Sequence, residues 1–226
     1  MKITFISDTH NKHNHLTSKG MGNILGSGDV LVHAGDITSM GKEHEIQNFL
    51  NWFARTDFKH KIFIAGNHDF GFEHGFEIDQ EFKDMGVIYL QDSEVTIDGV
   101  KFYGSPWQPE FYDWAFNLPR NGEEMKARWD AIPERTDILV THGPPYGYLD
   151  IPGGQSIRVG CEMLRHRVDE IKPKIHVFGH IHGANGYYFN GHTHFFNASV
   201  LNERYSYSNL PFTFEWDQAT NEITWL

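Results

Sequence analysis

The sequence has little cysteine and no long apolar run. Its 226 residues include a single cysteine, Cys161, so no disulfide forms within the chain and a thiolate zinc site is excluded. Apolar runs stay well short of the roughly 18 residues that a membrane-spanning helix requires. We therefore expect no membrane partner and no structural zinc finger.

Basic residues are also scarce. Lys and Arg number 19 against 30 Asp and Glu, which gives a net charge of −11. Because binding to long nucleic acid depends on cations that neutralise phosphates, this balance disfavours such a partner without excluding it. The first residues, 1–7, lack the apolar stretch and cleavage site of a signal peptide. We expect a cytoplasmic protein, in which the glycosylation-type triplet Asn197-Ala198-Ser199 has no meaning.

Histidine is the residue type in surplus. The chain contains 15 histidines, nearly as many as all Lys and Arg together. An acidic, histidine-rich chain with one cysteine favours a metal held by imidazole and carboxylate.

Short apolar runs typical of buried strands alternate with helical patterns. Five such runs occupy residues 3–6, 30–32, 62–64, 138–140 and 175–178. Apolar residues recur at helical spacing over 46–53 and 157–168, and Cys161 lies in a helix-like stretch, 158–172.

Later strands are predicted in pairs. Asp98-Gly99 and Asn190-Gly191 are typical of two-residue hairpin turns, and residues 212–216 and 223–225 look like further strands. No linker or repeat divides the chain, so we expect one domain, 1–226. Its predicted class is α/β, with a two-sheet core and helices outside.

Metal-binding side chains follow each of the five early strands. The clusters are Asp8-Thr9-His10, Gly35-Asp36, Gly66-Asn67-His68-Asp69, Thr141-His142-Gly143 and Gly179-His180-Ile181-His182. Because strand carboxyl ends converge in α/β sheets, we expect these clusters to meet in one site. Seven side chains exceed the needs of one ion: Asp8, His10, Asp36, Asn67, His142, His180 and His182. Two metals that share a carboxylate are predicted, as in phosphoryl-ester cleavage.

These clusters, in this order and spacing, resemble the motif blocks of the calcineurin-like metallophosphoesterase superfamily. They extend from residue 8 to residue 182. The stretches 104–109, 116–120 and 141–145 resemble a narrower branch, the metallophosphoesterase-domain-containing proteins. No Asp-Arg-Gly follows Gly35-Asp36, unlike in the Ser/Thr protein phosphatases.

The resemblance implies a four-layer α/β/β/α sandwich of two mixed sheets flanked by helices. It implies one metal on Asp8, His10, Asp36 and His182, and a second on Asp36, Asn67, His142 and His180, with Asp36 as the bridge. It also implies that His68 contacts the phosphate and assists the leaving oxygen. Asn67 and His68 are thus the predicted catalytic residues.

The leading hypothesis is a di-metal phosphodiesterase for small phosphate esters, nucleotides or cyclic nucleotides, acting through a hydroxide that bridges the metals. Manganese is the expected metal, and iron, zinc and magnesium also suit the ligands. One alternative is a phosphomonoesterase or nuclease of the same superfamily. Another is a nucleotide-binding regulator with weak catalysis. The sequence leaves the substrate, the metal and the oligomeric state open.

Several other polar and aromatic residues have structural or functional readings. His33 and His176 are interpreted as core or supporting histidines, and His192-Thr193-His194 as structural. For the aromatic segment 107–129, we favour packing over a wall that stacks a base. Whether Tyr146 and Arg158 contact substrate, and whether Asp69 orients His68, stays open at this point.

Overall fold

The computed structural model describes residues 1–18 and 22–226. Its strands are β1 (Lys2–Ile6), β2 (Gly28–His33), β3 (Phe58–Phe63), β4 (Val87–Tyr89), β5 (Ser93–Ile97), β6 (Val100–Ser105), β7 (Gln108–Pro109), β8 (Asn117–Leu118), β9 (Ile138–Thr141), β10 (Ile175–Phe178), β11 (Gly186–Phe189), β12 (His194–Asn197), β13 (Phe212–Asp217) and β14 (Glu222–Trp225). Its helices are η1 (His13–Thr17), α1 (Glu43–Ala54), α2 (Phe70–Glu73), α3 (Gln80–Asp84), α4 (Glu123–Asp130), α5 (Glu162–Ile171) and η2 (His182–Ala184), where η marks a 3₁₀ turn.

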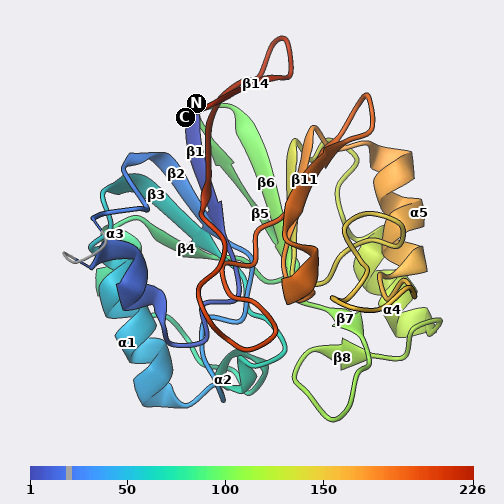
Figure 1. The fold of residues 1–226 in the computed structure, drawn as a ribbon, viewed down its shortest axis with the longest axis horizontal. Helices are drawn as coiled ribbons and strands as arrows, with labels where there is room; N and C mark the ends of the chain where they lie inside the picture. The colour runs from blue at the N-terminus through green and yellow to red at the C-terminus, as the bar shows by residue number, and fades with distance from the viewer. Residues whose placement is uncertain (19–21) are drawn as a thin grey trace.

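Two six-stranded mixed sheets form the centre of the molecule (Figure 1). The first has the order β14-β13-β1-β2-β3-β4, in which β1 to β4 are parallel. The second has the order β11-β12-β10-β9-β6-β5, with parallel pairing from β12 to β6. The remaining pairings, at the ends of each sheet, are antiparallel.

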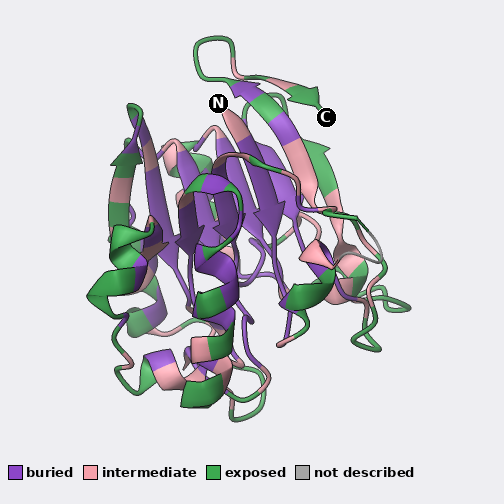
Figure 2. Ribbon diagram, turned by 90° about the vertical axis from the view of Figure 1, so that its left-hand side faces the viewer, coloured by how far each residue is buried: buried purple, intermediate pink, exposed green. Residues whose placement is uncertain are grey.

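Apolar side chains fill three layers between and outside the sheets. Phe5 of the first sheet and Phe102 of the second belong to one buried cluster between them. Phe49 of α1 packs against Phe63 on the outer face of the first sheet, while α4 and α5 cover the second sheet. Figure 2 shows strands coloured mostly as buried behind helices that carry both buried and exposed residues. The predicted α/β/β/α sandwich is therefore confirmed.

The five early strands and the turn at Asp98-Gly99 are confirmed, but two local predictions were wrong. The turn at Asn190-Gly191 has four residues, because Phe189 pairs with His194. The later helix starts only at Glu162, and Ile157 lies outside it with 61% of its surface exposed. Among the described residues, no helix combines the length and apolar character needed to cross a membrane.

Candidate metal centre

The five predicted clusters meet where strands of both sheets end, at the lower edge in Figure 1. The backbone N–H of Asp8 donates to the carbonyl of Gly35 at 3.0 Å, and that of Gly179 donates to His142 at 2.9 Å. A bridge between Ser7 and Ser199 joins the two sheets here. The site is thus built across the junction of the two sheets.

One set of side chains surrounds His182. Its Nε2 lies 3.4 Å from Asp8 Oδ1 and 3.3 Å from His10 Nε2. His10 Nε2 lies 3.6 Å from Asp36 Oδ2. Asp8, His10 and His182 therefore form one of the groups able to hold a metal ion, and Asp36 adjoins this group through His10.

A second set surrounds the side-chain oxygen of Asn67. Asn67 Oδ1 lies 3.0 Å from His142 Nε2 and 2.8 Å from His180 Nδ1. His142 Nε2 is 3.4 Å from Asp36 Oδ2, the same oxygen that faces His10. All seven predicted ligands are thus brought together, and Asp36 stands between the two sets.

The electrostatics of these residues suit bound cations. Burial alone would raise the pKa of Asp8, but the hydrogen bond and charge of His182 hold it below its ordinary value. The pKa of Asp36 is likewise lowered, mainly by His142, against the effect of burial. Burial would lower the pKa of both histidines, yet their carboxylate partners raise it to about 9 in each. The two carboxylates therefore favour a positive charge beside them, which bound divalent cations would supply.

Backbone carbonyls orient two of the imidazoles. His142 Nδ1 donates to the carbonyl of Ala34 at 2.9 Å, and His182 Nδ1 donates to that of Asn202 at 3.0 Å. Each bond leaves Nε2 of the ring as the nitrogen that faces the site. His180 instead turns Nδ1 inward, toward Asn67. The donor set of nitrogen and oxygen atoms fits two divalent cations.

Four of the ligand candidates have a left-handed backbone. Positive φ angles occur at Asp8 (56°), His10 (41°), Asp36 (56°) and His180 (66°). Such angles are uncommon outside glycine, and a non-glycine residue in this region costs of order 1–3 kcal/mol. Because the strands are held by extensive pairing, the surrounding structure offsets this strain and aims the side chains inward.

Two glycines allow the carboxylates to approach the backbone. A Cβ atom at Gly66 would lie 2.3 Å from Asp36 Oδ1, and one at Gly179 would lie 2.1 Å from Asp8 Oδ2. Any side chain at these positions would displace the carboxylate that it meets.

His68 lies at the edge of the site. Its backbone N–H donates to Asp36 Oδ1 at 2.9 Å, and its ring Nδ1 donates to the carbonyl of Ser39 at 2.8 Å. The ring therefore presents Nε2 as its free nitrogen. His68 also falls in a group with His10 and Asp36 whose atoms lie close enough to share a metal. The metal content of the His68→Ala variant distinguishes the role of ligand from that of non-ligand.

Asp69 does not contact the His68 ring. Its carboxylate accepts hydrogen bonds from Thr38 Oγ1 at 2.6 Å and from the backbone N–H groups of Gly66, Ile37 and Thr38 at 2.8–3.1 Å. Asp69 is fully buried and joins the loop that carries Asp36 to the loop that carries Asn67.

We expect Asp69→Ala to destabilise the protein by at least about 3 kcal/mol, because several buried donors lose their acceptor. A chain of this size would then unfold at a temperature lower by roughly 6–12 °C. Thermal unfolding followed by circular dichroism measures the change. Asp57→Ala, at an exposed aspartate, is the matched control and should unfold as the unaltered protein does. Equal melting temperatures for the two variants would contradict this role of Asp69.

A cleft of about 590 Å³ opens beside the candidate ligands. The aromatic segment 107–129 divides at this cleft: Phe111, Tyr112 and Trp114 line it, whereas Phe116 and Trp129 are buried in the core. Packing thus accounts for Phe116 and Trp129, while contact of the cleft-lining residues with substrate stays a prediction. Arg158 forms an ion pair with Asp150 at 2.6 Å, and Tyr146 does not line the cleft.

The loop 201–207 was missed by the sequence reasoning. Its Asn202 carbonyl holds His182, while Glu203 and Tyr205 line the cleft. The Tyr205 ring stands edge-on to His10, with ring centres 4.8 Å apart. No motif marks this loop, since its contribution depends on a backbone carbonyl and on a positive φ of 55° at Tyr205.

The triplet 197–199 supports the site through two of its side chains. Ser199 Oγ donates to Asp8 Oδ2 at 2.6 Å. The Asn197 side chain donates to the carbonyl of Ile181 at 2.9 Å, between His180 and His182. A hydroxyl and an amide thereby position three of the ligand candidates.

Other histidines have structural partners. Nε2 of His33 lies 2.9 Å from Thr9 Oγ1, and Nε2 of His176 donates to Thr141 Oγ1 at 2.8 Å. Both histidines are buried in strands beside the site.

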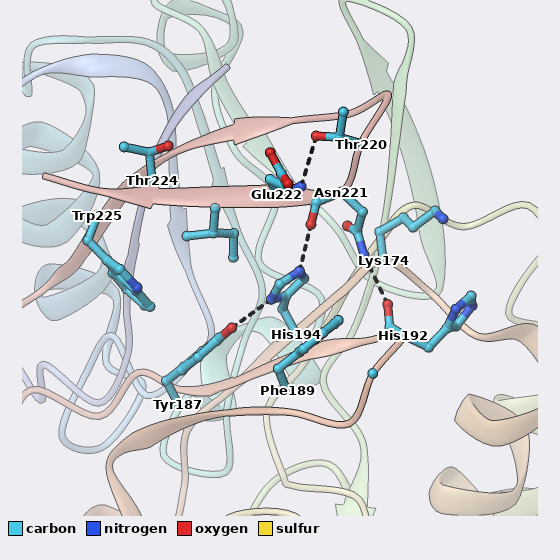
Figure 3. A pocket seen from close by; sticks show the side chains of 12 residues that line it. Lys174, Tyr187, Phe189, His192, His194, Thr220, Asn221, Glu222, Thr224 and Trp225 are labelled. Carbon is cyan, nitrogen blue, oxygen red and sulfur yellow. Dashed lines mark hydrogen bonds between the residues drawn. The ribbon is translucent and has the colours of Figure 1, made fainter.

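His194 lines a separate hollow of about 660 Å³ between the β11 and β14 regions (Figure 3). Its ring nitrogens lie 2.9 Å from the Tyr187 hydroxyl and 2.9 Å from the Asn221 carbonyl. Within the described part of the chain, no group able to hold a metal occurs here. The structural reading of His192-Thr193-His194 agrees with this arrangement.

The fold and the paired ligand sets define a metal-dependent phosphoesterase. A family model described as calcineurin-like phosphoesterase matches residues 1–184, so the chain belongs to this family. It is 40% identical to human metallophosphoesterase domain-containing protein 1 over 97% of the chain and 72% of that protein. It is 39% identical to UPF0046 protein K07C11.7 of Caenorhabditis elegans over 95% of the chain and 74% of that protein.

Solved structures show the same fold at low sequence identity. The structure of phosphopantetheinyl hydrolase from Mycobacterium tuberculosis has a TM-score of 0.53 and 18% identity, with 90% of each chain covered. TT1561 of Thermus thermophilus has a TM-score of 0.63 and 12% identity, with 99% of this chain and 96% of that chain covered. The narrower resemblance to metallophosphoesterase-domain-containing proteins is confirmed by the 40% identity to the human relative.

Proposed function

We propose that the protein is a di-metal phosphodiesterase for small phosphate esters, with nucleotides or cyclic nucleotides as the substrate class. The observation that carries this proposal is the position of Asp36 Oδ2. It lies 3.6 Å from His10 Nε2 and 3.4 Å from His142 Nε2, at the junction of two ligand sets that border one cleft.

The two sets support the ligand assignment. One cation would be held by Asp8, His10, Asp36 and His182, and the other by Asp36, Asn67, His142 and His180. When bound, the two cations lower the pKa of water to near 7 and offset charge on the phosphoryl oxygens. Manganese is our first choice, because imidazole and carboxylate ligands suit it.

His68 supplies the remaining chemistry. Its ring is fixed through Nδ1 by the Ser39 carbonyl, which leaves Nε2 to contact a phosphoryl oxygen or the leaving oxygen. A hydroxide derived from water forms a new bond to phosphorus as the bond from phosphorus to the leaving oxygen breaks. The bonding electrons remain on the leaving oxygen, and the proton on Nε2 passes to it. The leaving group then departs as a neutral alcohol, and His68 is protonated again by the proton released when the attacking water became hydroxide.

The charges around the cleft favour a diester over a monoester. Among the described residues that line it, Arg120 is the only Lys or Arg, and its guanidinium is already engaged by Glu162 and by backbone carbonyls. Glu110 and Glu203 add negative charge to the lining. A dianionic monoester would meet more repulsion here than a singly charged diester. The aromatic lining suits a base or aryl group.

The substrate preference is measured with the manganese-loaded protein. The substrates are bis(p-nitrophenyl) phosphate, p-nitrophenyl phosphate, 2′,3′- and 3′,5′-cyclic nucleotides and single-stranded DNA. We expect kcat/KM for the aryl diester to exceed that for the monoester by at least about tenfold. This ratio corresponds to a difference of about 1.4 kcal/mol in transition-state stabilisation.

Two results would replace this proposal by its alternatives. Preference for the monoester or for DNA would indicate a phosphomonoesterase or a nuclease. Binding of AMP by metal-loaded protein that hydrolyses none of the esters would indicate a nucleotide-binding regulator.

A further inference from the structure

Trp114 packs directly against the His68 ring. The ring centres are 4.2 Å apart and the planes are inclined by 33°, which is close to stacking. His10 meets His68 edge-on at a ring-centre distance of 4.6 Å. The hydrogen bond from Nδ1 to the Ser39 carbonyl also holds the ring, and Tyr205 stands further away, at a ring-centre distance of 6.5 Å. Of the two nearer aromatic rings, His10 is a proposed metal ligand, whereas Trp114 is not.

The loop that carries Trp114 is attached to the His68 segment. The N–H of Ala115 donates at 3.1 Å to the carbonyl of Asn67, which immediately precedes His68. The carbonyl of Ala115 accepts from Gln108 Nε2 at 2.8 Å, and the N–H of Phe116 donates to Glu73 Oε1 at 2.7 Å. Ala115 and Phe116 are fully buried. These hydrogen bonds and the burial of its neighbours therefore hold Trp114 at a fixed position relative to His68.

Trp114 and His68 also line the same cleft. A rotation of the imidazole away from its present plane would separate it from Trp114 and move Nε2 relative to the cleft. Misplacement of a proton donor by about 1 Å lowers a reaction rate by up to about 10²-fold. The neighbouring indole is therefore placed to control the orientation of the His68 ring.

We propose that Trp114 is a positioning residue, which holds the His68 imidazole so that Nε2 donates its proton to the leaving oxygen. This inference rests on the proposed phosphodiesterase function. It predicts that Trp114 contributes little where the leaving group needs no proton and much where it does. Leaving groups of high pKa need the proton most, because they depart poorly as anions.

The test uses the metal-loaded full chain and a series of methyl aryl phosphodiesters whose phenols differ in pKa. Trp114→Ala is compared with Trp114→Phe, which retains an aromatic face, and with Trp225→Ala. Trp225 is a half-exposed tryptophan on β14, outside the cleft, and serves as the matched control. Metal content and thermal unfolding are measured for each variant, so that loss of metals or of folding is recognised.

For Trp114→Ala, kcat should fall at least about tenfold more with the poorest leaving group than with the best, while KM changes less. Trp114→Phe should recover most of this loss, and Trp225→Ala should match the unaltered protein. In a His68→Ala background, Trp114→Ala should produce no further dependence on the leaving group.

Two outcomes overturn the inference while the proposed function stands. One is an equal loss with all leaving groups, which would make Trp114 a wall for binding alone. The other is the same leaving-group dependence with and without His68. If the unaltered, metal-loaded protein hydrolyses none of the diesters, the proposed function itself has failed, and the inference falls with it.

Discussion

Replacing Asp36 with alanine is expected to abolish turnover and to strip the purified protein of most of its metal. Asp36 Oδ2 lies within 3.6 Å of both His10 Nε2 and His142 Nε2. The substitution therefore removes the one carboxylate that both proposed metal sites use. It also leaves two sets of imidazoles facing each other with one negative charge fewer between them, which disfavours two adjacent dications.

Metal analysis of natively purified protein, together with the aryl diester assay, measures the result. Asp29→Ala is a suitable control, because Asp29 lies near the start of β2, whereas Asp36 follows the end of that strand. It accepts a hydrogen bond from the N–H of Lys2, far along the strand from the proposed metals. Circular dichroism should show both variants folded. Normal activity, or a full metal content, in Asp36→Ala would contradict the two-metal proposal.

The ligand candidates could be predicted because each follows a strand, and each of these strands is indicated by a run of apolar residues. Strand ends in parallel sheets meet at one edge, so Asp8, Asp36 and Asn67 converge as soon as β1, β2 and β3 pair. The same reasoning applies to His142 and His180 after β9 and β10. The sandwich of two mixed sheets was implied by the family resemblance, and the order of the strands within each sheet was not predicted.

What could not be predicted depends on backbone conformation. The left-handed φ angles at Asp8 and Asp36 direct their carboxylates, and no local pattern in the sequence indicates them. The choice of Nδ1 in His180 but Nε2 in His142 follows from hydrogen bonds with residues distant in sequence. Sequence motifs do not indicate which backbone carbonyls accept hydrogen bonds, such as that of Asn202, because every residue has a carbonyl.

The hydrogen-bond partners of some polar side chains could not be predicted from the sequence either. Asp69 follows His68 directly, yet its carboxylate turns to Thr38 and joins two loops. Ser199 looked irrelevant as part of a glycosylation-type triplet, but it bonds to Asp8. In both cases the partner is chosen by tertiary packing, which spacing along the chain does not encode.

Removal of the His68 side chain should slow hydrolysis by about 10²–10⁴-fold, the usual contribution of a general acid or base, while both metals stay bound. The reason is the geometry of the ring. Nδ1 is engaged with the Ser39 carbonyl, and Trp114 covers one face, so Nε2 is oriented for contact with substrate. The rate loss should grow with the pKa of the leaving group, since the missing proton then matters more.

The metal content of His68→Ala decides between two roles of His68. The question arises because His68 lies close enough to His10 and Asp36 to share an ion with them. If His68 were a ligand, His68→Ala would lose metal together with activity, much as Asp36→Ala does. If it acts on the leaving oxygen, activity falls while metal content stays at that of the unaltered protein. His192→Ala, at an exposed histidine outside the cleft, controls for loss of an imidazole as such. A His68→Ala protein that keeps its metals but hydrolyses poor and good leaving groups with equal loss would assign His68 to phosphate binding instead of proton donation.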